Sequence, residues 1–245
     1  MSAIAVRPVE GLGEVVPGDD LAVLLRAATG PLLPDEVIVM AHKIVSKAEG
    51  AVVDLAGIVP SPRATEIAAQ YEKDPRVVQV VLDESAELVR VDRGVLICRT
   101  HHGFVCANAG VDASNAGAAG RVITLPRDPD QSARDLRAAL PGHPAVVISD
   151  SFGRAWRHGQ CDVAIGIAGL EPLDDWRGRH DADRAPLRAT WIAIADQAAA
   201  AADLVRTKDA RVPAAVISGL GQFVTAADGP GAAALVRPRA EDLFS

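Results

Sequence analysis

Aromatic residues are scarce in this sequence: Phe, Trp and Tyr together make up only 3% of the chain. Hydrophobic residues nevertheless account for 49%, so the core has to be built mostly from Ala, Val, Leu and Ile. Charged residues make up 23%, an ordinary proportion for a folded protein, which excludes a disordered chain. At 245 residues the chain is long enough for one large domain or two small ones.

Long apolar runs and an excess of positive charge are also missing. No stretch approaches the roughly 20 apolar residues that a membrane helix requires, and the N-terminus lacks the apolar core of a signal peptide. The net charge is −7, and no basic run marks a nucleic-acid-binding surface. We therefore expect a cytoplasmic protein that binds small molecules rather than nucleic acid or a membrane.

Cysteines and the common nucleotide-binding motifs are equally sparse. Cys98, Cys106 and Cys161 are widely spaced, so we expect buried thiols rather than zinc or redox chemistry. The chain has neither a G-x-x-x-x-G-K-[ST] loop nor a G-x-G-x-x-G fingerprint. A nucleotide would therefore have to bind by means other than a P-loop or a Rossmann site.

The order of apolar runs and turn residues predicts a mixed α/β (α+β) fold, with buried strands and an antiparallel meander packed with helices. Continuous apolar runs predict buried strands at 37–41 and 145–149, and short β-rich runs predict the meander between 88 and 107. Helices are expected at 21–28, 64–71, 76–82, 131–140 and, from its alanine content, 189–208. No linker divides the chain, so we expect a single module over 1–245, with a peripheral C-terminal tail.

Acidic residues follow two of the predicted strand regions. Asp112 comes after the meander, and Asp150 and Ser151 follow the strand at 145–149. Carboxylate and hydroxyl oxygens suit hard cations such as Mg²⁺ or Mn²⁺, so Asp112 and Asp150 could share a pair of metal ions, with Ser151 as a further ligand. The alternative is that each Asp is a turn former or a helix cap, which is the commoner role of an isolated Asp.

Cationic residues lie close to these positions. Arg154 and Arg157 follow Asp150, and their guanidinium groups could hold phosphate or carboxylate, so both are catalytic candidates. Lys43 and Lys47 follow the buried strand at 37–41, where α/β proteins commonly bind ligands, and Lys47 could contact a phosphate. The alternative for these lysines is an ordinary solvated position.

These segments together resemble the coenzyme F420-0:L-glutamate ligase family. The resemblance rests on blocks that occur in the family's order, namely GLGEV at 11–15, PGDDL at 17–21, IVSKAEG at 44–50, GFVCANAGVDASN at 103–115, DSFGRAWRHGQ at 150–160 and the helix at 195–205. Each block is weak alone, but the set spans nearly the whole chain.

The resemblance implies an F420 ligase-like fold, a homodimer, and a GTP-dependent enzyme that adds L-glutamate to F420-0, with further γ-linked glutamates as an open extension. It implies that Asp112, Asp150 and Ser151 bind Mn²⁺ or Mg²⁺, and it leaves K⁺ open as an additional cation. The positions that it places at the GTP are Leu12, Gly13, Glu14, Val15, His42, Lys47 and Asn115.

Four positions depart from the family's usual pattern. Gly13 stands where Pro is frequent, His42 where a small hydroxyl residue is usual, and Arg184 and Thr207 where Gly is common. These departures concern nucleotide preference and loop geometry rather than the reaction. Two rival hypotheses stay open, namely a ligase of the same scaffold that uses another carboxylate acceptor and a non-catalytic nucleotide-binding module. The flavin-reductase-like domain that follows in some relatives is not expected here.

Overall fold

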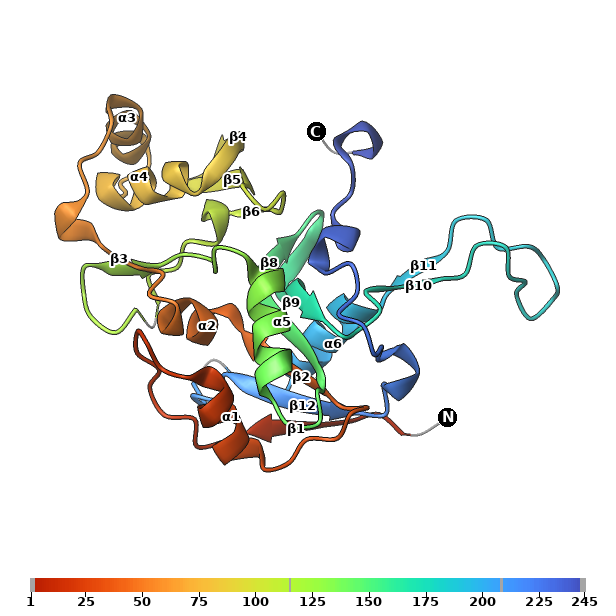
Figure 1. The fold of residues 1–245 in the computed structure, drawn as a ribbon. Helices are drawn as coiled ribbons and strands as arrows, with labels where there is room; N and C mark the ends of the chain where they lie inside the picture. Colours follow the sequence, from red (N-terminus) through yellow and green to blue (C-terminus); the bar gives the residue numbers. More distant parts are fainter. Residues whose placement is uncertain (1–2, 115, 208, 243–245) are drawn as a thin grey trace.

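A five-stranded sheet forms the centre of the computed structural model, which describes residues 3–114, 116–207 and 209–242 (Figure 1). Its order is β1–β12–β2–β8–β9, in which β2 and β8 are parallel and the other neighbours are antiparallel. The strands are β1 (Ala5–Val9), β2 (Val37–Ala41), β8 (Ala145–Arg154), β9 (Arg157–Ala168) and β12 (Ala214–Ser218). The predicted mixture of helices and strands is confirmed.

Helices cover both faces of this sheet, which explains why β2 is apolar throughout. Ile38 and Met40 pack with α1 (Leu21–Thr29) and α5 (Pro129–Ala139), while Val37 and Val39 pack with α6 (Ile194–Asp203). Successive side chains of a strand point to opposite faces, so a strand covered on both sides needs an unbroken apolar run. The short helix α2 (His42–Ala48) follows β2 directly.

The predicted meander forms a smaller lobe with two helices, seen at the upper left of Figure 1. Each helix begins at a capping side chain followed by proline, which has a preset backbone angle suited to the first turn. The lobe contains α3 (Pro62–Gln70), α4 (Pro75–Asp83), β4 (Ser85–Asp92), β5 (Val95–Thr100), β6 (Val105–Ala107) and the 3₁₀ turn η2 (Asn108–Gly110). Below it lie the antiparallel strands β3 (Val52–Asp54) and β7 (Arg121–Ile123), with the turn η1 (Leu55–Gly57) after β3.

The long alanine-rich helix predicted over 189–208 is wrong at both ends. Helix α6 spans only Ile194–Asp203, because Trp191–Ala193 forms β11, which pairs with β10 (Leu173–Asp175). The segment 173–193, which these two strands begin and end, forms an arm. The Arg177 guanidinium lies 4.0 Å from the centre of the Trp191 ring, a contact that stabilises the paired end of the arm. Alanine propensity is a weak preference that tertiary pairing overrides. In Figure 1 the arm extends away from the central sheet.

Two further boundaries differ from the sequence-based predictions. The strand predicted to end at Ser149 continues to Arg154, because β9 pairs with it along its whole length. The C-terminal tail, predicted to be peripheral, buries Ala232 and packs Leu235 against the core between the central sheet and α6. Its turns are η3 (Gly221–Phe223), η4 (Ala232–Leu235) and η5 (Arg239–Glu241). None of the helices in the described ranges is long and apolar enough to cross a membrane.

Candidate active site

Helix α2 presents polar side chains at helical spacing towards the two predicted acidic positions. His42 and Ser46 are four residues apart, and the His42 Nδ1 atom lies 3.2 Å from the Ser46 hydroxyl. Lys43 and Lys47 are also four residues apart, on the neighbouring stripe. The alternative of a solvated lysine does not hold for Lys47, which is only 8% exposed. A buried ammonium needs an anionic partner, so α2 is suited to hold one.

Lys43 holds Asp112 in place. Its Nζ lies 2.6 Å from Asp112 Oδ2 and donates to the Ser114 hydroxyl at 2.8 Å, while the other Asp112 oxygen accepts from the Ser114 N–H. Backbone bonds between Asp112 and Ile123 fix the chain at this point. Burial raises the pKa of the Asp112 carboxyl, but Lys43 and Ser114 outweigh it, so the pKa lies below its usual value.

Asp150 lies within β8, beside His42 at the start of α2. The His42 Nε2 atom is 3.4 Å from Asp150 Oδ1, yet it is buried without a hydrogen-bond partner among the described residues. Burial raises the pKa of Asp150, but the His42 ring and the N–H of Ser151 lower it below its usual value. The negative charge of Asp112 opposes this by raising the Asp150 pKa. The two predicted aspartates therefore lie close enough to interact electrostatically.

A buried network supports the strand beside Asp150. The Ser151 hydroxyl donates to Asp162 Oδ1 at 2.6 Å, and the Ser149 hydroxyl donates to Asp162 Oδ2 at 2.8 Å. Arg206 donates to Asp162 Oδ2 at 2.6 Å and to Ser149 at 3.0 Å. The Asp162 and Arg206 side chains are 5% and 4% exposed, so this ion pair sits in the interior. It fixes the serines on either side of Asp150.

The donor set around Asp112 and Asp150 fits a hard cation that takes some of its ligands from elsewhere. In the described part of the chain, no three His, Cys, Asp or Glu side chains gather as a metal site. An all-protein cage is therefore absent from those residues. Mg²⁺ commonly uses one or two carboxylates and completes its shell with water and substrate phosphates. Two aspartates with neighbouring hydroxyls match that pattern.

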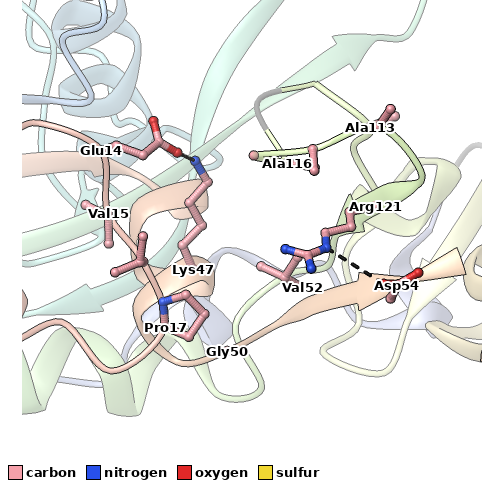
Figure 2. Close-up of a pocket in the computed structure, with 14 residues that line it drawn as sticks. Glu14, Val15, Pro17, Lys47, Gly50, Val52, Asp54, Ala113, Ala116 and Arg121 are labelled. Carbon is pink, nitrogen blue, oxygen red and sulfur yellow. Dashed lines mark hydrogen bonds and ion pairs between the residues drawn. The ribbon is translucent and has the colours of Figure 1, made fainter.

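A cavity of about 910 Å³ opens beside Lys47 (Figure 2). The Lys47 ammonium reaches Glu14 Oε1 at 2.5 Å on one side, and Arg121 lies 3.9 Å from Asp54 on the other. Figure 2 shows Glu14, Val15 and Pro17 of the N-terminal loop on one side of this space, and Ala113, Ala116 and Arg121 on the other. Ala113, which follows Asp112, belongs to the lining, so the cavity adjoins Asp112.

The N-terminal loop of this cavity exposes its backbone for a structural reason. Leu12 and Val15 bury their side chains in the main core, and Gly13 and Glu14 between them are exposed. Gly13 has a φ of +65°, a left-handed conformation that a proline ring cannot adopt. The backbone that this loop adopts therefore does not accommodate proline at position 13.

The other predicted site residues lie elsewhere or outside the described ranges. Arg154 and Arg157 are strand partners at the exposed end of the β8–β9 hairpin. Arg154 donates to the carbonyl oxygens of His158 and Gly159. The predicted GTP contact Asn115 falls outside the described residues. The roles of all these positions stay predictions.

Several residues at the site escaped the sequence analysis. The local sequence assigns Lys43 no role of its own, although its i, i+4 spacing from Lys47 indicates a shared helix face. Asp162 and Arg206 are 44 residues apart, and no local pattern links them. Only the tertiary structure reveals their pairing.

The buried cysteines of this region act as small apolar side chains. Cys98 and Cys106 are buried, as predicted, and Cys161 is half-buried. Burial, with the nearby negative charge of Asp150, raises the pKa of Cys106 to about 12. A thiol with that pKa stays protonated at neutral pH and acts as a small apolar side chain.

Comparison with known proteins identifies the family of this chain. Residues 11–219 match the sequence profile of the family described as F420-0:Gamma-glutamyl ligase. The chain belongs to this family. Among its relatives, the Coenzyme F420:L-glutamate ligase of Methanothermobacter thermautotrophicus is 44% identical, with 98% of each chain covered. The proteins of the same name from Methanopyrus kandleri and Methanocaldococcus jannaschii are 42% and 39% identical, covering 100% and 97% of this chain and 98% and 97% of their own lengths.

The F420-0:γ-glutamyl ligase match spans the whole candidate site. Asp112, Asp150, Lys47 and Arg154 all lie inside the matched residues, as does every residue that lines the first cavity. The C-terminal tail from residue 220 onwards lies beyond the match. The part of the chain that carries the family resemblance is therefore the part that brings these polar groups together.

Proposed function

We propose that this protein is a GTP-dependent ligase that joins L-glutamate to coenzyme F420-0 through an amide bond, in F420 biosynthesis. The observation that carries the proposal is the aspartate pair, Asp112 and Asp150, which two separate segments bring together beside the cationic helix α2. The relatives named as Coenzyme F420:L-glutamate ligases supply the reaction. A module that only binds nucleotide has no need of this carboxylate pair.

In this proposal GTP occupies the first cavity. Lys47 contacts its phosphates as a buried point charge, and His42 lies near them on the same helix. The loop from Leu12 to Val15, in which Gly13 and Glu14 are exposed, contacts the nucleotide. Asn115, which falls outside the described residues, is proposed as a further contact. The volume of about 910 Å³ is at the upper end of the usual range for small-molecule sites and accommodates a nucleoside triphosphate.

Asp112, Asp150 and Ser151 are the residues that would hold Mn²⁺ or Mg²⁺, with K⁺ as an additional cation to be tested. A divalent cation would neutralise negative charge that gathers between the nucleotide and a carboxylate substrate. The Ser151 hydroxyl donates to Asp162, which fixes its oxygen beside Asp150 in the chain, at the position that the proposal gives to a further ligand. A cation at Asp112 would also compete with the Lys43 ammonium, which then turns to phosphate.

The reaction that we propose balances in two steps. A carboxylate oxygen of F420-0 attacks the γ-phosphorus of GTP, so the bond to GDP breaks and an acyl phosphate forms. The amine of L-glutamate then attacks the acyl carbon, so a C–N bond forms, phosphate leaves and the amine loses a proton. Arg154 and Arg157 bind carboxylate or phosphate groups at the hairpin end. Water has to be excluded because it would hydrolyse the acyl phosphate.

Mass spectrometry tests the proposal directly. F420-0 incubated with the protein, GTP, L-glutamate and Mn²⁺ should gain one or more glutamyl units, and the gain should disappear in Asp150→Ala. Replacing GTP by ATP, and Mn²⁺ by Mg²⁺ with or without K⁺, defines the nucleotide and the cations. The number of added units decides whether the product is itself an acceptor.

Each outcome has a distinct meaning. Full activity in Asp150→Ala would remove the aspartate pair from the mechanism. Metal-dependent GTP turnover without any mass gain would favour a ligase that uses another carboxylate acceptor. Absence of GTP turnover by folded protein would favour a non-catalytic binding module. Light scattering on the same sample measures whether the protein is the homodimer that we expect of this cytoplasmic enzyme.

A further inference from the structure

A second cavity, of about 740 Å³, shares none of its lining residues with the first. It lies between the meander, the β8–β9 hairpin, the first turn of α6 and the C-terminal tail. The lining residues that matter for its chemistry are Arg99, Phe104, Phe152, Arg154, Asp196 and Arg237. The tail, which lies beyond the family match, thus closes one side of it.

Strand β8 connects this cavity to the aspartate pair. Residues two apart on a strand point to the same face and are separated by about 6.6 Å, so Asp150, Phe152 and Arg154 form one row. The two irregularities in the pairing add residues on β9 and leave the alternation of β8 intact. Phe152 and Arg154 line the cavity, so the row runs from the carboxylate into it.

The cavity has an aromatic wall in a chain that has few aromatic residues. Two of the four phenylalanines, Phe104 and Phe152, line it, with ring centroids 6.4 Å apart and planes at 67°. The His102 ring stacks behind Phe104 at 5.7 Å and fixes its orientation. Both phenylalanines are only partly buried, so their faces contribute to the surface of the cavity. Such a wall suits a planar ring system.

Guanidinium groups surround this wall. Among the described residues, Arg154 donates only to backbone carbonyl oxygens, and so does Arg237, whose contact is with Glu241. In the described ranges no carboxylate lies within ion-pair distance of either one. Arg99, by contrast, reaches Glu87 and Asp242. Two exposed cations without carboxylate partners beside an aromatic wall favour an aromatic ligand that carries negative charge.

We infer that this second cavity binds the carboxylate acceptor, a planar fused-ring compound with an anionic side chain, and the first cavity only the nucleotide. The ring system packs against Phe104 and Phe152, the anionic groups pair with Arg154 and Arg237, and the terminal carboxylate reaches towards Asp150. The two substrates then approach the aspartate pair through separate openings. This assignment rests on the proposed function, because it takes F420-0 as the acceptor.

Binding of F420-0 without GTP tests the assignment. Isothermal titration calorimetry compares the unmodified protein with Arg237→Gln and Phe104→Leu. We expect the Kd for F420-0 to rise about tenfold in Arg237→Gln, which corresponds to about 1.4 kcal/mol. Phe104→Leu keeps the apolar volume and loses the aromatic face, so we expect a rise of about fivefold. The Kd for GTP should stay within twofold in both.

Matched controls come from the same elements. Arg239→Gln removes an exposed tail arginine that pairs with Glu87 and does not line the cavity. Phe223→Leu changes a phenylalanine that packs against the α6 side of the central sheet and does not line the cavity. Both controls should keep the F420-0 affinity of the unmodified protein. Circular dichroism and the Tm of each variant confirm that it is folded.

The failure of this inference can be told apart from failure of the proposed function. If the unmodified protein adds glutamate to F420-0 but both lining variants bind F420-0 normally, the acceptor assignment is overturned and the function stands. Weakened GTP binding with unchanged F420-0 binding would overturn it as well, by placing the nucleotide in this cavity. If the unmodified protein neither binds nor modifies F420-0, the proposed function fails first.

Discussion

At the scale of single residues, the Arg206–Asp162 pair shows what the site depends on. The pair is almost completely buried and also holds the Ser149 and Ser151 hydroxyls on both sides of Asp150. A buried ion pair is expensive to desolvate, so its removal as a whole can cost little. Loss of one partner, however, leaves an unpaired charge in the interior. The position of Asp150 therefore depends on the completeness of this network.

Replacement of Arg206 by Met tests this dependence. We expect Arg206→Met to lower the free energy of unfolding by about 3–5 kcal/mol, because the Asp162 carboxylate is left buried without a counter-charge. Urea unfolding measures the loss. The double variant Arg206→Met/Asp162→Asn removes both charges and keeps partners for the serines, so it should recover much of the stability. A single variant that loses less than about 1 kcal/mol would contradict the burial of this pair.

At the scale of elements, β8 is longer than the sequence predicts, and its added residues include the candidate site residues. The apolar run that signals a buried strand ends at Ile148, and nothing in the polar residues after it indicates a strand. Pairing with β9 carries the strand to Arg154, so Asp150 sits in a regular extended backbone rather than at a strand end. The Asp150 carboxylate therefore projects from a strand, which holds a side chain in place more precisely than a loop does.

The end of this hairpin allows a test that separates catalysis from stability. Arg154→Ala should lower kcat/KM about ten- to hundredfold, the range expected for loss of one charged hydrogen bond to substrate. The Tm should stay nearly unchanged, since the side chain is exposed and contacts only carbonyl oxygens. Arg157→Ala tests the second predicted arginine in the same way. Arg63→Ala, on the exposed surface of α3, is the matched control. An unchanged rate would remove Arg154 from the site.

Helix α6, by contrast, is shorter than its sequence pattern predicts. Its alanine content predicts a helix of twenty residues, and the helix has ten. The residues before it pair as β11, and Leu204 after it is exposed. The alanine stripe itself packs against β2 and β9, so composition identified the helix, but tertiary contacts decided its length.

At the scale of the whole molecule, two separate cavities lie next to the two aspartates in the chain: Ala113, which follows Asp112, lines the first, and Phe152, two residues after Asp150, lines the second. The first is bounded by the N-terminal loop and the loop after Asp112, and the second by the meander, the hairpin and the tail. Segments from both ends of the chain are needed to build them. In the proposed function, the anionic nucleotide and the anionic acceptor enter through separate cavities. They meet only beside Asp112 and Asp150, where a bound cation would neutralise their negative charge.

The pH dependence of folding offers a whole-molecule test at Asp196, in the first turn of α6. Burial raises the pKa of its carboxyl above the usual 3.8, while its bond from the Ala164 N–H opposes the shift. The folded state therefore binds a proton more tightly than the unfolded state, and stability falls as the pH rises from 3.8 through the raised value. Asp196→Asn removes this loss and keeps an acceptor oxygen for Ala164.

Unfolding by urea between pH 3.5 and 7 measures the effect. The free energy of unfolding of Asp196→Asn, relative to the unmodified protein, should increase as the pH rises through that window and then level off. Asp135→Asn, on the exposed surface of α5, is the control and should show no such trend. A constant difference across the whole range would mean that burial does not perturb Asp196.

The sequence by itself determined the fold class and most elements, and it pointed to the two acidic candidates, because all of these depend on local signals. Apolar runs, proline and capping residues, and an Asp after a strand are all readable over a few neighbouring residues. Only the tertiary structure decided where β8 and α6 end, that the tail packs inward, and that Lys43, Asp162 and Arg206 support the site. Those features arise from pairing between segments tens of residues apart, which no local pattern encodes.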